Sequence, residues 1–175
     1  MYNIIDLELN SWPSKRAIGI VEIGIVEMNT DFELTRTVSK LVRPDVGYLT
    51  EATATLTGIA PEDILSADKL DIIIARLIKE SFFNKRVVVA WGTDYDTIQR
   101  DVHSLVLHPF DVINAQVLYS IRTNRSPTTR ISLSQASTEC GIPFVGNKHR
   151  ALDDAIQTAK IFKYMMDQRV EPENE

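Results

Sequence analysis

The chain has 175 residues, of which 44% are hydrophobic and 25% are charged, and its formal net charge is −5. This balance is typical of one globular domain and argues against a protein that coats nucleic acid by charge alone. No apolar run approaches the ~20 residues of a membrane helix, and the single cysteine, Cys140, excludes an intramolecular disulfide. We therefore expect one domain over residues 1–170 with a frayed acidic tail at 171–175, in a cytoplasmic setting and without a membrane partner.

The N-terminal part of the chain predicts three consecutive strands in a β-meander. Residues 2–9 form the first expected strand. Residues 16–27 are β-rich and mostly apolar, as is typical of a central strand. After turn residues at 28–31, residues 32–42 predict the third strand.

The middle of the chain predicts helices after a break at residues 43–47. A short helix fits Glu51–Thr57, with Gly58 as its C-cap, and a second helix begins at Pro61. Apolar residues then recur at three- and four-residue spacing from Leu70 to Phe83, which indicates an amphipathic helix.

From residue 86 onward, strands alternate with helices. The predicted strands are 86–91 and 111–114, and the predicted helices are 94–107, 115–122, 133–140 and 151–166. Three meandering strands followed by alternating elements indicate an α/β fold, with a five-stranded mixed sheet flanked by helices.

Two carboxylates stand one residue apart in the first strand, Asp6 and Glu8. Side chains at i and i+2 of a strand point to the same face, so the two acids project together. Adjacent anions repel unless a cation lies between them, and oxygen ligands suit magnesium or manganese. The alternative is the polar face of an edge strand.

Two further segments place acids where elements change. Asp94 and Asp96 follow the strand at 86–91, and either could face a site at the strand end. The alternative makes Asp94 a helix N-cap and Asp96 a first-turn acid. Likewise, Asp153 and Asp154 start the last helix, where the helix dipole favours acids, and His149 precedes it.

Together these residues suit phosphodiester cleavage. The reaction needs a nucleophilic water, neutralised phosphoryl oxygens and a stabilised leaving group, and two metal ions held by several carboxylates supply these. A histidine can accept the proton of the water because its pKa lies near neutrality.

The arrangement resembles the DEDDh 3′→5′ exonucleases, a group that includes oligoribonuclease, ribonuclease T and polymerase proofreading subunits. The three motifs are Asp6-Leu7-Glu8, the segment around Asp96, and His149 followed by Asp154. Further similarity lies in residues 21–26, in Leu56-Thr57-Gly58-Ile59 and in the run from Ser132 to Ala155. The resemblance covers nearly the whole chain.

The resemblance implies a ribonuclease H-like fold and two divalent metal ions, Mg²⁺ or Mn²⁺. Asp6 would bridge both ions, Glu8 and Asp154 would complete one site, and Asp96 would hold the other. His149 would be the general base. The substrate would be the 3′ end of single-stranded RNA or DNA, and the product a nucleoside 5′-monophosphate.

The chain also departs from the family pattern. Leu9 replaces the usual threonine after the first motif, and the second motif reads Trp91-Gly92-Thr93-Asp94-Tyr95-Asp96 instead of containing His-Asn. Trp-Gly followed by Tyr-Asp resembles the branch with Eri-type RNA exonucleases and KinA-inhibitor-like proteins, which favours RNA. An extra residue between Gly92 and Tyr95 shifts this alignment.

The resemblance implies substrate contacts at Leu9, Asn10 and Trp12, because the family usually contacts the terminal nucleotide after the first motif. Glu22 in the second strand is a further expected substrate contact. An aromatic ring at position 12 can stack on a base, at ~1–3 kcal/mol per base. The alternatives are a loop anchor for Trp12 and a polar strand-edge residue for Glu22.

Two other functions stay open from the sequence. One is an exonuclease-like protein that mainly binds and regulates a protein partner, and the other is a proofreading or repair exonuclease that acts on DNA. Some relatives dimerise, so a homodimer is also compatible with the sequence.

Overall fold

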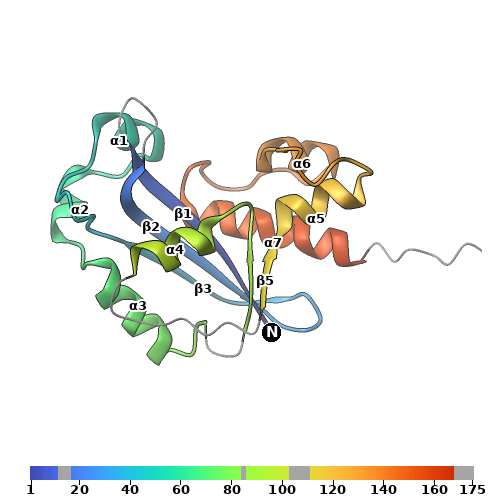
Figure 1. Cartoon of the computed structure of the whole chain (residues 1–175), viewed down its shortest axis with the longest axis horizontal. Coiled ribbons are helices and arrows are strands. Elements are labelled where there is room, and N and C mark those ends of the chain that lie inside the picture. Colours follow the sequence, from blue (N-terminus) through green and yellow to red (C-terminus); the bar gives the residue numbers. More distant parts are fainter. Residues whose placement is uncertain (12–16, 84–85, 103–110, 168–175) are drawn as a thin grey trace, which may run out of the picture.

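The structure, a computed structural model, describes residues 1–11, 17–83, 86–102 and 111–167. The predicted substrate contact Trp12, residues 103–107 of a predicted helix and the predicted tail at 171–175 lie outside these ranges. Over the described ranges, the protein is a single five-stranded sheet with helices packed against it (Figure 1).

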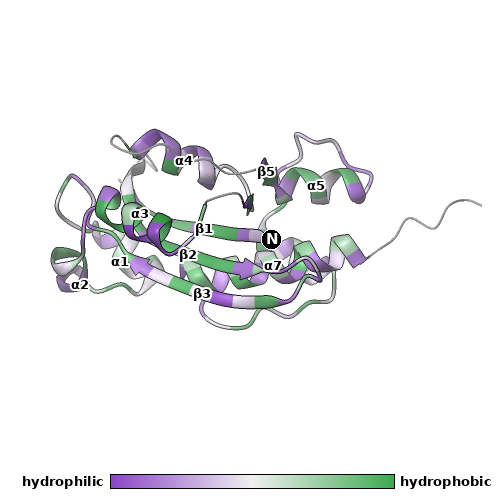
Figure 2. Ribbon diagram, turned by 90° about the horizontal axis from the view of Figure 1, so that it is seen from below, coloured by the Kyte–Doolittle hydropathy of each residue, from purple (hydrophilic) through white to green (hydrophobic). Residues whose placement is uncertain are grey.

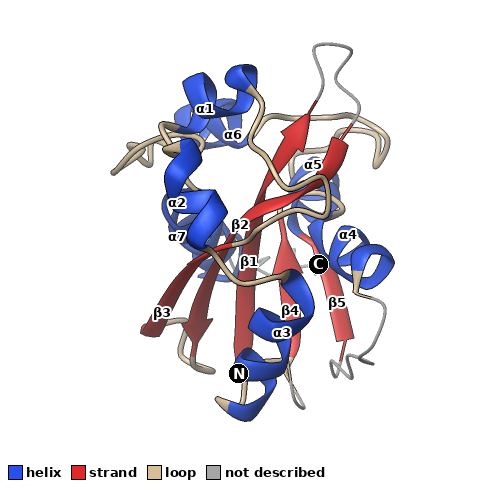
Figure 3. Cartoon of the chain, turned by 90° about the vertical axis from the view of Figure 1, so that its left-hand side faces the viewer, coloured by secondary structure: helices blue, strands red, loops and turns tan. Residues whose placement is uncertain are grey.

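The strands are β1 (Tyr2–Ser11), β2 (Ala17–Met28), β3 (Leu34–Leu41), β4 (Val87–Ala90) and β5 (Asp111–Asn114). They lie in the order β3-β2-β1-β4-β5, which Figure 3 shows from one edge of the sheet to the other. The first three strands pair antiparallel, whereas β4 and β5 run parallel to β1. The predicted mixed sheet, a meander extended by parallel strands, is confirmed.

The helices are α1 (Glu51–Thr57), α2 (Pro61–Ser66), α3 (Leu70–Lys79), α4 (Asp94–Asp101), α5 (Ala115–Arg122), α6 (Leu133–Glu139) and α7 (Ala151–Asp167). Gly58 closes α1 as predicted, and the side chains of Thr50 and Ser132 accept hydrogen bonds from the first turns of α1 and α6. The helix α3 ends four residues before its predicted end, because the chain turns so that Phe83, at a φ of 62°, enters the core.

Alternation along β1 divides the core between the two faces of the sheet. Ile5 and Leu7 join the cluster that includes residues of α3 and α4, whereas Ile4 joins the cluster formed by α5, α6 and α7. By the two-residue period of a strand, Asp6 and Glu8 share the face of Ile4. The acids therefore stand where this apolar face meets the start of α7.

Figure 2 shows β1 and β2 mostly in the colour of hydrophobic residues, as the buried centre of the sheet requires. Their residues are covered on both faces, which explains the nearly continuous apolar sequence of β2. Within the described ranges, none of the helices is both long and apolar enough to pass through a membrane.

Candidate active site

The site begins with the pairing of β1 and β2. Asp6 lies opposite Gly24, and Glu8 lies opposite Glu22. Gly24 lets a helix approach very closely, because a Cβ atom there would lie 2.2 Å from the carbonyl carbon of Ala151. The first turn of α7 therefore lies directly on β2, beside the two acids of β1.

This helix start brings the third motif to the first. Ligand atoms of Glu8, His149 and Asp154 all lie within 4.8 Å of one another. The backbone N–H of His149 donates to a carboxylate oxygen of Asp154 at 3.2 Å. His149 has a φ of 63°, in the left-handed region that is costly for a residue with a side chain. This local strain occurs at a residue that faces the acidic cluster.

Asp153, the neighbour of Asp154, has a different function in the fold. Its carboxylate accepts a hydrogen bond of 2.8 Å from the backbone N–H of Asn147. Gly146 packs on the same carboxylate with a φ of 102°, and a Cβ atom there would lie 2.5 Å from the carboxyl carbon. Asp153 thus holds the loop that leads to His149, while Asp154 faces the site.

Of the two acids at the start of α4, Asp94 and not the predicted Asp96 is the one whose charge acts on the cluster. The charge of Asp94 contributes to the shifted pKa of Asp6, and Asp154 contributes to that of Asp94. Asp96 is exposed. The N-cap of α4 is Thr93, so Asp94 is not the N-cap that we considered.

The helical period explains why Asp94 takes this place. Tyr95 and Ile98 form the buried face of α4. Asp94 lies four residues before Ile98 and so shares its side of the helix. Asp96 lies two residues from both Asp94 and Ile98, and it projects toward solvent. The extra residue between Gly92 and Tyr95 shifts the alignment of the second motif, and the motif alone therefore did not indicate Asp94.

The carboxylates raise one another's pKa. Burial, followed by the charges of Asp94, Asp154 and other acids, holds the pKa of Asp6 well above its usual value. Burial and then Asp154 raise the pKa of Glu8 to about 8 and that of Asp94 to about 7. Burial also raises the pKa of Asp154, although its hydrogen bond from His149 opposes the shift.

Such a cluster fits divalent cations. Bringing several carboxylates together is costly unless they are protonated or share positive charge. Carboxylate oxygens are the ligands that Mg²⁺ and Mn²⁺ prefer, and these ions reverse the local electrostatics of an acidic site. The donor set of Asp6, Glu8, Asp94 and Asp154 therefore suits metal binding.

Asn10 and Glu22, two of the expected substrate contacts, are buried and form hydrogen bonds with other protein groups. The amide of Asn10 donates to the Tyr48 carbonyl at 2.8 Å and accepts from the Thr50 backbone N–H at 2.9 Å. Both carboxylate oxygens of Glu22 accept hydrogen bonds from protein groups. Neither residue has any exposed surface, so both have structural contacts where we expected a substrate. Leu9 is half-buried and packs on the core cluster that includes α3.

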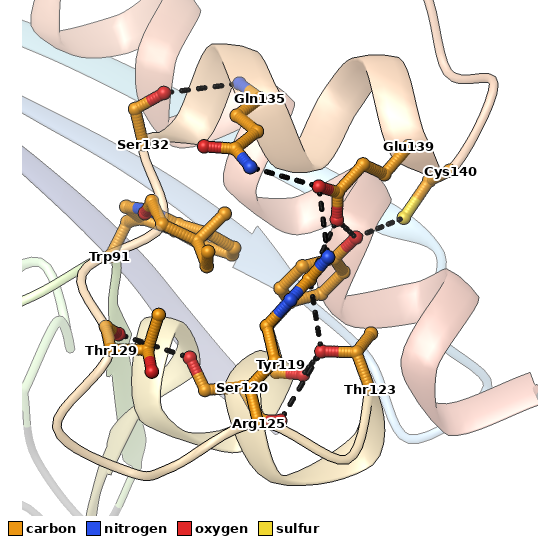
Figure 4. A network of polar contacts seen from close by, with 11 residues as sticks. Trp91, Tyr119, Ser120, Thr123, Arg125, Thr129, Ser132, Gln135, Glu139 and Cys140 are labelled. Carbon is orange, nitrogen blue, oxygen red and sulfur yellow. Dashed lines mark hydrogen bonds and ion pairs between the residues drawn. The ribbon is translucent and has the colours of Figure 1, made fainter.

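A polar network beyond the cluster supports the second motif (Figure 4). The indole N–H of Trp91 donates to the Ile131 carbonyl at 2.9 Å, and the Trp91 ring packs against Tyr119 with centroids 5.7 Å apart. The Tyr119 hydroxyl donates to Glu139 at 2.8 Å, and Arg125 pairs with the same carboxylate. These contacts fix Trp91, which follows the end of β4 and lies three residues before Asp94, and no sequence motif indicated them.

The chain is similar to known proteins in sequence and in structure. The profile of the RNase_T exonuclease family matches residues 4–162. No curated protein matches the sequence. A full-length 3′-exonuclease superposes with a TM-score of 0.83 at 22% identity, over 95% of this chain and 60% of that protein. This chain therefore spans less than two thirds of that relative.

Two further solved structures bear on the site. The nuclease domain of 3′hExo, a DEDDh family member bound to rAMP, has a TM-score of 0.82 at 21% identity, over 95% of this chain and 91% of that domain. S. pombe Pop2p in its Mg²⁺- and Mn²⁺-bound form has a TM-score of 0.73 at 13% identity, over 97% of this chain and 86% of that one. At these identities, the similarity shows a common fold.

The family profile and the fold together define the class of the protein. The chain belongs to the RNase_T exonuclease family. Its fold is that of the nuclease domain of 3′hExo, which is itself a DEDDh family member.

Proposed function

We propose that the protein is a metal-dependent 3′→5′ exonuclease that removes nucleoside 5′-monophosphates from single-stranded ends. The observation that carries this proposal is the convergence of Glu8, Asp154 and His149 within 4.8 Å. Asp6 and Asp94 complete the carboxylate set, because the charge of Asp94 helps to raise the pKa of Asp6.

Two divalent ions, Mg²⁺ or Mn²⁺, fit this donor set. Asp6, Glu8, Asp94 and Asp154 are the residues that would hold them, with Asp94 in the position we had expected for Asp96. When bound, the ions would lower the pKa of the attacking water and neutralise charge on the phosphoryl oxygens.

In this proposal His149 is the general base. Its ring lies beside Glu8 and Asp154 but remains exposed, so it can meet a water molecule on the substrate side. His149 takes the proton as the water oxygen attacks phosphorus. The bond from phosphorus to the 3′ oxygen of the preceding nucleotide breaks, and this oxygen keeps the electron pair and takes a proton from solvent to become the new 3′-hydroxyl. The 5′-phosphate then leaves on the released nucleotide.

RNA is the substrate we favour over DNA. The support is the rAMP bound to the similar nuclease domain of 3′hExo and the Trp-Gly pair of the second motif, which resembles RNA-directed relatives. The 2′-hydroxyl distinguishes the two nucleic acids at a protein surface. Because the described site contains a full set of acids and a histidine, catalysis is a better proposal than regulation of a protein partner alone.

The test is a time course on two end-labelled oligonucleotides of the same sequence, one RNA and one DNA, with Mn²⁺ and with EDTA. The Asp6→Ala variant is the inactive control, and Asp96→Ala is a control for loss of an exposed acid on α4. We expect stepwise shortening from the 3′ end that requires both Mn²⁺ and Asp6, and that is faster on RNA.

Faster cleavage of DNA would overturn the RNA preference but not the exonuclease. If the folded protein shortens neither oligonucleotide, the exonuclease proposal fails and binding of a protein partner becomes the function to test.

A further inference from the structure

Glu22 is a buried acid that the proposed chemistry does not use. It lies directly opposite Glu8 in the β1–β2 ladder, and its charge raises the pKa of Glu8. Like charges directly opposite each other destabilise a pair of strands. A charged carboxylate with no solvent exposure also needs partners for its oxygens.

The partners of Glu22 come from the start of α7. Arg150 donates to both oxygens, through Nε at 3.1 Å and Nη2 at 2.9 Å, in the two-bond geometry that guanidinium and carboxylate groups favour. The backbone N–H of Ala151 donates to Glu22 at 3.0 Å, and the Ser39 hydroxyl does so at the same distance. Glu22 therefore joins β2, β3 and the first residue of α7.

These contacts flank the residues that form the site. Arg150 directly follows His149, and Asp154 lies one helical turn beyond Arg150, to whose carbonyl it donates its backbone N–H at 3.0 Å. A shift of this turn along β2 would move His149 and Asp154 together relative to Glu8. Gly24 permits the close approach of the helix but offers no directional contact.

We propose that Glu22 and Arg150 are positioning residues, which together form a clamp that fixes the start of α7 so that His149 and Asp154 face Asp6 and Glu8. The inference rests on the proposed exonuclease function and extends it to two residues that would touch neither substrate nor metal.

The clamp acts through geometry more than through stability. A buried ion pair adds little net stability, because the cost of desolvating two charges offsets their attraction. Its two parallel hydrogen bonds nevertheless select a single arrangement of the groups that carry it. Loss of a group that orients metal ligands commonly lowers metal affinity or activity. We expect the same of this clamp.

The test uses Glu22→Gln, Arg150→Gln and Arg150→Lys in the full chain. Glu27→Gln is the matched control, because Glu27 is a buried acid on the same strand, pairs with Arg36 and Arg86, and projects to the opposite face. The measurements are kcat, KM and Mn²⁺ dependence on a labelled oligonucleotide, direct Mn²⁺ affinity by calorimetry, and amide hydrogen exchange at Ala151 and Asp154.

We expect the three clamp variants to lose ~10- to 100-fold in kcat and in Mn²⁺ affinity, with KM within about twofold of wild type. Arg150→Lys should be the mildest, because it keeps the charge and loses the two-bond geometry. Amide exchange at Ala151 should accelerate in all three. Glu27→Gln should lose stability but keep wild-type kcat, Mn²⁺ affinity and exchange at Ala151.

Three results would overturn the clamp. The first is that folded clamp variants keep wild-type kcat and Mn²⁺ affinity. The second is that Arg150→Gln raises KM alone, which would make Arg150 a substrate contact. Glu27→Gln could also reduce kcat as much as Glu22→Gln does, which would reduce the effect to stability. If wild-type protein cleaves nothing, the exonuclease proposal fails, and Mn²⁺ affinity and amide exchange still decide the clamp.

Discussion

Asp94 and Asp96 are separated by one residue, yet the structure gives them opposite environments. We expect Asp94→Ala to reduce kcat by at least ~100-fold, because Asp94 is a proposed metal ligand and loss of a ligand forfeits several kcal/mol of transition-state stabilisation. Asp96→Ala should stay close to wild type, because its side chain is exposed on α4. Steady-state kinetics on a labelled oligonucleotide, together with Mn²⁺ titration, compares the two variants.

The pair of variants is its own control, since each removes one carboxylate from the same helix turn. Loss of activity in Asp96→Ala with full activity in Asp94→Ala would restore the alignment that the motif spacing first predicted. Helical periodicity in the sequence already favours Asp94 over Asp96. Tyr95 and Ile98 mark the buried side of α4, and Asp94 lies on that side while Asp96 does not.

His149 offers a second residue-scale prediction. His149→Ala should lower kcat by ~10²–10⁴-fold, because a positioned general base contributes that much to proton transfer. Oligonucleotide binding should survive, since a general base acts on the attacking water and does not hold the strand. Single-turnover kinetics with a separate binding assay measures both effects. A wild-type rate would remove His149 from the chemistry.

Other residues could not be placed without tertiary contacts. The sequence indicated that Asn10 and Glu22 stand near the site, but not whether they face a substrate. Asn10 is bound by residues about 40 positions away and Glu22 by a residue 128 positions away. No local pattern reports contacts at that separation, and a polar residue beside a motif therefore suggested substrate binding in both cases.

At the scale of elements, the seating of α7 on β2 depends on one missing side chain. Gly24→Ala should destabilise the protein by about 3 kcal/mol, at the upper end for overpacked cores, because its Cβ would overlap the backbone of Ala151. Urea unfolding would measure the loss. Since the overlap involves backbone atoms, Ala151→Gly should not rescue it. An unchanged unfolding midpoint would show that α7 can move away from β2 at little cost.

Most elements follow from local signals in the sequence. The bounds of α1, β5 and α5 match their predictions, because a cap or a turn residue marks each end. The end of α3 was wrong, since the apolar spacing continues to Phe83 although the chain leaves the helix at Lys79. Phe83 still reaches the core, but from a turn. Hydrophobic periodicity therefore reports burial more reliably than helical conformation.

At the scale of the whole molecule, the fold brings together acids that are far apart in sequence. Asp6 and Glu8 come from the central strand, Asp94 from the helix after β4, and Asp154 from the last long helix (Figure 1). Each acid is placed by a buried apolar neighbour on its own element. The stable sheet thereby holds charges that would otherwise repel one another, and the cost falls on the free energy of folding.

This cost predicts an unusual pH dependence of stability. The pKa of Glu8 rises from 4.5 to about 8, and that of Asp94 from 3.8 to about 7. The folded state therefore binds the protons of Glu8 and Asp94 more tightly than the unfolded state does. At a pH between the unfolded and the folded pKa values, the folded state carries more of these protons. Under this linkage, the free energy of unfolding falls as pH rises. The loss should begin above the unfolded pKa values and be complete once the pH exceeds about 8.

In EDTA, we therefore expect the Tm to decrease from pH 5 to pH 8, by on the order of 10 °C for a loss of a few kcal/mol. Mn²⁺ should reverse the trend, because it binds the ionised carboxylates and stabilises the folded state more as they lose their protons. Thermal unfolding at each pH, with Mn²⁺ and with EDTA, should thus give curves that diverge toward pH 8. Asp94→Asn should flatten the fall in EDTA, whereas Asp96→Asn should leave it intact. An EDTA Tm that stays constant or rises over this range would mean that the four acids do not share a buried site.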